Sequence, residues 1–244
     1  MHITIDIETI PDQREGALEA FQKDARENFS APSDLTKERA AIDLGLADPQ
    51  EIKFTSKAAM LDRWVERFKE EKSDEVAEQN WRKTSFDGGA GQLFCFGIAI
   101  CEGEPIAICD DSEAEMLRQA FRMMESSLEY GRRPVLIGHN HTGFDLRFIY
   151  QRAIINGVTP PIWWPHNARP WDTEIVFDTM IQWAGIGGRI KLDKLCKIIG
   201  IDGKQDDIDG SKVWDFVKAG EYQKVLDYCC DDVKKTRAIY RRMT

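Results

Sequence analysis

The sequence of 244 residues lacks the cysteine and histidine patterns of a small domain held together by disulfides or zinc. Its six cysteines contain no CxxC pair, and together with the four histidines they show no spacing typical of a zinc site. Three of the cysteines lie in apolar, strand-like runs, so we expect buried free thiols in a reducing compartment. A fold held by disulfides or by structural zinc is therefore excluded.

Long apolar runs are also absent. No stretch is apolar over the length needed to span a bilayer. The N-terminus enters a strand-like segment directly, without the basic and apolar regions of a signal peptide. We therefore expect a cytoplasmic protein with no membrane partner.

The sequence also lacks an excess of positive charge. With 33 Lys and Arg against 42 Asp and Glu, the net charge is −9, which argues against coating of nucleic acid through the overall field. A local cationic groove beside an acidic site is still compatible with this balance. Three candidate patches, each equally consistent with an ordinary solvated face, are Arg132-Arg133, the run Arg189, Lys191, Lys194 and Lys197, and Lys234-Lys235-Arg237 with Arg241-Arg242.

The first segment of the chain, residues 2–10, alternates polar and apolar side chains in the manner of a strand. Its isoleucines at alternate positions share one face, and Asp6 and Glu8 lie side by side on the other. Two adjacent carboxylates repel each other, and one is driven to take a proton unless a cation lies between them. Taken alone, the pair also fits a solvated face in this acidic chain.

Residues 12 to about 85 are charged and helix-like, with no convincing strand. Asp48-Pro49 is typical of a helix N-cap followed by proline in the first turn. One apolar stripe has helical spacing and is interpreted as packing: Leu61, Trp64, Val65 and Phe68. We predict two to four helices inserted after the first strand.

The rest of the chain alternates strands and helices. Apolar runs at 92–101 and 105–109 predict a hairpin whose first strand is buried on both faces. Ser112 is expected to cap a helix that ends near residue 127, a strand follows at 134–138, and another helix begins near Gly143. This order predicts an α/β domain with a mixed sheet.

Two further motifs carry acids. Asp145 stands at a strand-to-helix junction, where ligands of α/β folds gather. Tyr228 and Asp232 are four residues apart on a predicted C-terminal helix and therefore share a face. Each motif alone is also compatible with a purely structural role.

Together the motifs resemble the DEDD superfamily of 3′–5′ exonucleases, in its tyrosine branch. The histidine branch would require a histidine where Asp227 stands. Residues 138–153 look most like the proofreading exonuclease of family-B DNA polymerases and its stand-alone relatives, and residues 209–214 also resemble these. The resemblance covers residues 1–10 and 86–244, and it rests on Asp6-x-Glu8, Asn140-xxx-Phe144-Asp145 and Tyr228-xxx-Asp232.

The resemblance implies an RNase H-like α/β fold, with a mixed five-stranded sheet flanked by helices, forming one exonuclease domain over residues 1–244. The helical insertion at 12–85 departs from the compact family pattern. The implied activity is hydrolysis of single-stranded DNA from the 3′ end with two Mg²⁺ or Mn²⁺ ions. Asp6 would bridge both ions, Glu8 and Asp232 would complete the site that activates water, and Asp145 would hold the ion near the leaving oxygen.

The same resemblance assigns roles beyond the metal ligands. Tyr228 would orient the attacking water, because a phenol with a pKa near 10 is a poor base at neutrality. Thr9 and Asn140 would contact the terminal nucleotide or its phosphate, and Phe144 would pack beneath the site. Three histidines are expected to form hydrogen bonds in loops rather than bind metal: His139, His141 and His166.

Several alternatives stay open in the sequence. The adjacent Trp163 and Trp164 would either stack on unpaired bases or pack in the core. An alternative is an exoribonuclease of the same branch, resembling the ribonuclease D group. Discrimination between DNA and RNA depends on contacts to the 2′-hydroxyl, and no residue in the sequence decides it. A non-catalytic module that binds nucleic acid or a polymerase is a further alternative, and a replication or repair partner is possible. The insertion is hypothesised to overhang the substrate channel and to select strand length.

Overall fold

The computed structural model describes residues 1–128, 133–201 and 208–244. The chain forms two units, one made of Met1–Pro11 with Thr84–Thr244 and the other of Asp12–Lys83. Arg132, part of one predicted cationic patch, lies outside the described residues.

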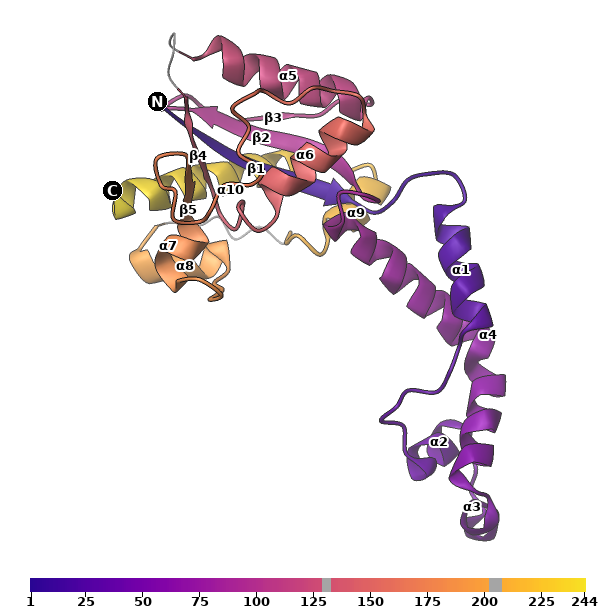
Figure 1. Cartoon of the computed structure of the whole chain (residues 1–244). Coiled ribbons are helices and arrows are strands. Elements are labelled where there is room, and N and C mark those ends of the chain that lie inside the picture. Colours follow the sequence, from indigo (N-terminus) through magenta and orange to yellow (C-terminus); the bar gives the residue numbers. More distant parts are fainter. Residues whose placement is uncertain (129–132, 202–207) are drawn as a thin grey trace. The chain divides into compact units, whose positions relative to one another are not determined.

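The first unit contains a mixed five-stranded sheet in the order β3-β2-β1-β4-β5 (Figure 1). Its strands are β1 (His2–Ile10), β2 (Gln92–Ile100), β3 (Ile106–Ile108), β4 (Val135–Gly138) and β5 (Val176–Asp178). The central β1 pairs antiparallel with β2 and parallel with β4. The predicted mixed sheet is therefore confirmed, although no strand was predicted at the three residues of β5.

Helices cover both faces of this sheet (Figure 1). Their bounds are α5 (Glu113–Ser126), α6 (Asp145–Ile155), α7 (Thr179–Ala184), α8 (Leu192–Ile199), α9 (Val213–Lys218) and α10 (Tyr222–Met243). Ser112 caps α5 as predicted, since its Oγ accepts a hydrogen bond from the Glu115 amide at 3.3 Å. The α5 and α6 helices lie over the face of β1 that carries its isoleucines.

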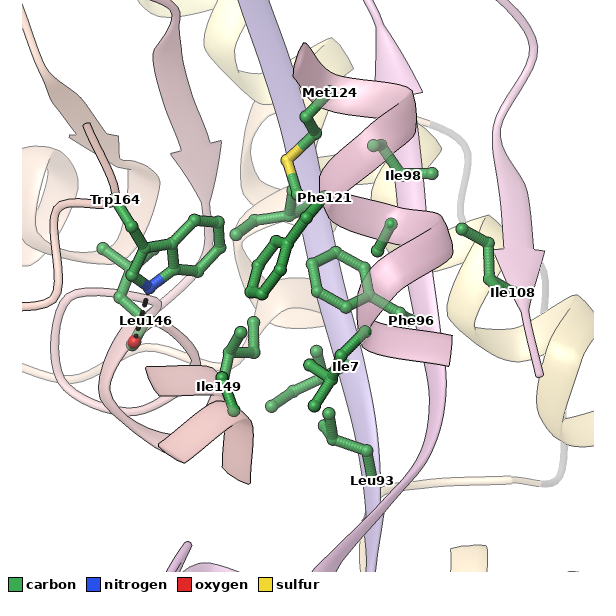
Figure 2. Packing of buried hydrophobic residues seen from close by; sticks show 14 of the residues in the cluster. Ile7, Leu93, Phe96, Ile98, Ile108, Phe121, Met124, Leu146, Ile149 and Trp164 are labelled. Carbon is green, nitrogen blue, oxygen red and sulfur yellow. Dashed lines mark hydrogen bonds between the residues drawn. The ribbon is translucent and has the colours of Figure 1, made fainter. Parts of the chain in front are cut away.

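The main core fills the space between the sheet and these two helices. In Figure 2, Ile7 of β1 and Phe96 of β2 pack together with Phe121 of α5 and Ile149 of α6. Burial of each such side chain contributes roughly 1.5–3 kcal/mol to folding. Trp164 joins this core, where its Nε1 donates to the Leu146 carbonyl at 3.0 Å and only 5% of its surface is exposed. The interpretation of Trp164 as a base-stacking residue is therefore wrong, because its ring is already covered by protein.

The opposite face of β1 is covered by α10. A Cβ atom at Gly97 of β2 would lie 2.6 Å from Cys229 Sγ and 2.9 Å from Val233 Cγ2, so only glycine permits this approach. Gly97 is the register partner of Asp6. The acidic face of β1 is therefore beneath a helix, which excludes the solvated-face interpretation.

A buried ion pair ties α5 to α6. The guanidinium of Arg152 donates to both carboxylate oxygens of Glu113, at 2.8 and 2.6 Å, and Glu113 also accepts from the Leu93 amide at 2.8 Å. Replacing Arg152 with alanine leaves the buried carboxylate unpaired, so we expect the free energy of unfolding to fall by about 3–5 kcal/mol. Urea titration measures this, with the exposed Arg147→Ala as the control. Equal denaturation midpoints for the two variants would contradict the assignment.

The second unit contains α1 (Ala17–Glu27), α2 (Lys37–Asp43), α3 (Pro49–Phe54) and α4 (Lys57–Lys83), within the predicted number of helices. Asp48 caps α3, because its Oδ1 accepts from the Gln50 amide at 2.8 Å. Trp64 packs between Phe29 and Phe68, so the predicted apolar stripe is packing. Among the helices described in the chain, none is long and apolar enough to cross a lipid bilayer.

Candidate active site

The site begins on β1. The parallel pairing of β1 with β4 covers only the first half of β1, up to Thr4, so its second half extends past the end of β4. Asp6 and Glu8 project from this second half, and their carboxylate oxygens and the Cys229 sulfur all lie within 4.8 Å of one another. The Cys229 thiol lies 3.7 Å from Asp6 Oδ2 and supports that carboxylate from the α10 side.

The third acid reaches β1 from the loop between β4 and α6. Asp145 is the first residue of α6, and its carboxylate accepts a hydrogen bond from the backbone amide of Ile7. The loop before it is tightly turned, since Asn140 has φ 64° and its carbonyl accepts from the Phe144 amide at 3.0 Å. The turn brings Asp145 against the two acids of β1.

Asp178 organises this loop, and sequence reasoning missed it. Its Oδ1 accepts from the Asn140 amide at 2.9 Å, and its Oδ2 accepts from the Thr142 hydroxyl at 2.7 Å. Burial alone would raise the pKa of Asp178, but contacts with His141 and Thr142 outweigh burial and leave that pKa below its usual range. Asp178 is therefore an ionised anchor that fixes the loop carrying Asn140 and Asp145. The only signal in the sequence was an aspartate before the threonine that begins α7.

The fourth acid comes from α10. Asp232 and Tyr228 are hydrogen-bonded to each other, as their spacing of one helical turn predicts. Lys235 approaches the same carboxylate, with its Nζ 3.4 Å from Asp232, 3.0 Å from Asp231 and 2.7 Å from Asp193. Lys235 thus links α10 to α8 beside the site.

Two members of the predicted C-terminal cationic patch, Lys235 and Arg237, are buried, so this part of the prediction is wrong. Lys235 is only 5% exposed and is surrounded by three carboxylates. Arg237 is 8% exposed, and its Nη1 donates to the Cys101 carbonyl at 3.1 Å. Both cations are structural, because helical spacing turns them toward α8 and the sheet rather than toward solvent.

Burial raises the pKa of all four acids, and repulsion from neighbouring carboxylates adds to this effect. Burial and the charges of Asp232 and Asp145 raise the pKa of Asp6 well above its usual range, and burial and Asp6 do the same to Glu8. Burial raises the pKa of Asp145 to about 7, against the opposing effects of His141 and backbone amides. Burial raises the pKa of Asp232 to about 6, although Lys235 and Tyr228 oppose it. Carboxyl groups with such raised pKa values retain protons near neutral pH unless a cation lies between them.

This donor set fits divalent cations. Within residues 1–128, 133–201 and 208–244, no lysine or arginine forms an ion pair with Asp6, Glu8 or Asp145. Carboxylate oxygens are the hard ligands that Mg²⁺ and Mn²⁺ prefer. The four acids could hold such ions, whose positive charge would favour the ionised form of these buried carboxylates.

A single cleft of about 840 Å³ collects the functional side chains. All eight residues singled out from the sequence line it: Asp6, Glu8, Thr9, Asn140, Phe144, Asp145, Tyr228 and Asp232. Gly210, in the segment 209–214 that resembles known relatives, lines it as well. The structure thus brings the predicted set together, and the individual roles stay predictions.

The sequence model of a protein family described as a "Predicted 3'-5' exonuclease related to the exonuclease domain of PolB" matches residues 104–244, more than half of the chain. The chain belongs to this family. It is therefore a 3′–5′ exonuclease, and the resemblance drawn from the motifs is confirmed.

No curated protein matches the sequence. Among solved structures, the exonuclease is similar to the family B DNA polymerase from the hyperthermophilic archaeon Pyrobaculum calidifontis, with 15% identity and a TM-score of 0.49. That likeness covers 64% of this chain and 22% of the polymerase chain, so the exonuclease spans only a small part of the polymerase's length.

The three histidines expected to form hydrogen bonds in the exonuclease do so. His139 Nε2 lies 2.9 Å from the Ile190 carbonyl, and His141 Nε2 lies 3.2 Å from the Leu136 carbonyl. His166 bonds to the Asn167 side chain at 2.9 Å and stacks on Tyr150.

Sequence reasoning missed several residues of the exonuclease cleft. Ser85 and Phe86 follow the insertion, where Ser85 accepts a 2.8 Å hydrogen bond from the Thr9 hydroxyl through its carbonyl. Phe86 is 69% exposed and meets the ring of Phe144 edge-on, with centroids 6.3 Å apart. The cleft is also lined by Arg189, Lys191 and Lys194, three members of a cationic patch predicted from the sequence, whereas Lys197 of that patch does not line it.

Proposed function

We propose that this exonuclease removes nucleotides from the 3′ end of single-stranded DNA, using two Mg²⁺ or Mn²⁺ ions held by its four clustered carboxylates. The convergence of four acids and a tyrosine in one cleft carries this proposal. The volume of about 840 Å³ falls in the range of roughly 300–1,000 Å³ in which proteins bind small ligands, so a terminal nucleotide fits. DNA is favoured over RNA because the family is related to the exonuclease domain of PolB. A replication or repair process in the cytoplasm is the setting that this substrate suggests.

The four clustered carboxylates differ in their surroundings, and these surroundings indicate their roles in the proposed reaction. Asp6 is central, because it neighbours Glu8 on β1 and faces Asp145 and Asp232 from two other elements. When bound, divalent ions supply charge that stabilises the phosphorane-like transition state and lowers the pKa of a coordinated water. Lys235 and Tyr228 both contact the carboxylate of Asp232, which restricts its orientation.

Tyr228 acts as a neutral phenol. Burial and the charges of Asp232, Glu8 and Asp6 raise the pKa of Tyr228 above its usual value, so the hydroxyl stays protonated at any physiological pH. Its proton is directed to Asp232, which leaves the oxygen lone pairs free to accept a hydrogen bond from an attacking water. This arrangement orients the water without removing its proton.

Replacing Tyr228 with phenylalanine is expected to lower the turnover rate by roughly 10²-fold, the effect typical of lost orientation of a reacting group. Metal affinity measured by calorimetry should stay unchanged, because the phenol is not a metal ligand. Tyr222→Phe is the matched control, since Tyr222 lies on the same helix and does not line the cleft. An undiminished rate in Tyr228→Phe would remove its assigned role.

The proposed activity is tested with 5′-labelled single-stranded DNA and a matched RNA oligonucleotide, each with Mg²⁺ or with EDTA. We expect a metal-dependent ladder of DNA products that shortens from the 3′ end and is absent in Asp6→Asn. Preferential degradation of the RNA would replace the DNA proposal with exoribonuclease activity. A folded wild-type protein that cleaves neither oligonucleotide would contradict both.

A further inference from the structure

We infer that Arg189, Lys191 and Lys194, here called the cationic segment, bind the phosphates of the substrate strand next to the scissile bond. This inference rests on the proposed function, because it names the surface that holds the polynucleotide while the acids act on its end. Arg189 and Lys191 lie directly before α8 and Lys194 lies in its first turn. All three are exposed and line the same cleft as the four carboxylates.

The cationic segment is fixed at the cleft by His139. The imidazole lies between two elements, with Nδ1 2.8 Å from the Thr179 hydroxyl of α7 and Nε2 2.9 Å from the Ile190 carbonyl. Ile190 is the residue between the first two cations. His139 itself belongs to the loop that carries Asn140 and Asp145, so the cations are held in register with the acidic site.

The three cations are available for a ligand. In the part of the chain that the structure describes, Arg189, Lys191 and Lys194 form no ion pair, whereas the neighbouring Asp193 is occupied by Lys235 at 2.7 Å. Because Asp193 pairs with Lys235, it does not neutralise the positive charge of the neighbouring cationic segment. A cluster of carboxylates repels a polyanion, so binding of nucleic acid to a chain of net charge −9 requires such a local positive surface.

The chemistry of the segment indicates phosphate rather than base recognition. Lysine and arginine contacts to phosphate fix the position of a strand without reading its sequence, as an exonuclease that advances along a strand requires. The same contacts would serve DNA and RNA equally. The role of the cationic segment also differs from that of the four carboxylates, which act only at the terminal phosphodiester.

The test compares a cleft variant with a matched control of equal charge. The cleft variant is Arg189→Gln with Lys191→Gln and Lys194→Gln. The control is Lys197→Gln with Lys218→Gln and Lys234→Gln, three exposed lysines outside the cleft. Each is assayed on a single-stranded oligonucleotide and on the p-nitrophenyl ester of thymidine 5′-monophosphate, which has no neighbouring phosphates.

We expect the cleft variant to raise KM for the oligonucleotide roughly 10–100-fold, from the loss of three surface charge contacts, and to hydrolyse the small ester as the wild type does. Loss of three phosphate contacts should also reduce the slope of log Kd against log salt by about 2, measured for the oligonucleotide with Ca²⁺ present. The control variant should change neither quantity. Equal oligonucleotide KM values and salt slopes in the two variants would overturn the inference.

Failure of the inference and failure of the proposed function give different results. If the wild type degrades neither DNA nor RNA, the proposed function fails, while the salt dependence of oligonucleotide binding still decides whether the segment contacts phosphates. If the cleft variant loses hydrolysis of the small ester as strongly as that of the oligonucleotide, the cations act at the reacting phosphate and the inference is wrong.

Discussion

Replacement of Asp6 by asparagine is expected to lower the rate of phosphodiester hydrolysis by about 10³-fold or more, the loss that follows when several kcal/mol of transition-state stabilisation by metal are removed. Asp6 is adjacent to Glu8 and interacts with Asp145 and Asp232, so it is the acid best placed to contact both of the proposed ions. Asp232→Asn should have a similar effect. Single-turnover assays at saturating Mg²⁺ measure the chemical step directly.

The protein should stay folded in both variants. An amide has nearly the shape of a carboxylate, and removing one of several like charges relieves repulsion in the cluster. Asp231→Asn is the matched control, since this residue contacts Lys235 at 3.0 Å next to Asp232 but does not line the cleft. Circular dichroism separates lost activity from lost fold. A folded Asp6→Asn with the wild-type rate would show that the clustered acids are structural.

The second large effect concerns thermal stability. Without metal the stability of the protein should fall as the pH rises, and a divalent metal ion should remove this loss. In the metal-free protein the pKa of Asp145 is about 7 and that of Asp232 about 6, both above the ordinary value of 3.8. A carboxyl group with a raised pKa binds its proton more tightly in the folded state, so ionising it opposes folding. This penalty is absent below the unfolded-state pKa near 3.8, grows as pH rises from there to the folded-state pKa of about 6 for Asp232 and about 7 for Asp145, and is complete above those values.

We therefore expect the midpoint of thermal unfolding in EDTA to fall by on the order of 10 °C between about pH 5 and pH 8. Mn²⁺ should restore stability at the higher pH and have little effect at the lower, because ions bind the deprotonated carboxylates. Asp145→Asn should flatten the curve measured in EDTA. A metal-free midpoint that rises with pH across this range would contradict the expected linkage.

Local periodicity made much of the fold and site visible in the sequence. The alternation in β1 placed Asp6 and Glu8 together, and the spacing of Tyr228 and Asp232 placed both on one face of α10. These relations depend only on the repeat of a strand or helix, which neighbouring residues fix. The order of the acidic motifs along the chain then sufficed to indicate the family.

Tertiary structure decided what depends on contacts between distant segments. Asp178 ends a strand of three residues, too short to show periodicity, and it fixes a loop 38 residues earlier in the chain. Lys235 had the spacing of a surface cation, yet its partner Asp193 lies 42 residues away and holds it inside the protein. Arg189 belonged to a predicted cationic patch that fitted a solvated face equally well, and only the structure placed it in the cleft with the four acids. Burial and charge pairing are properties of the assembled sheet and helices, so the local pattern of residues could not determine them.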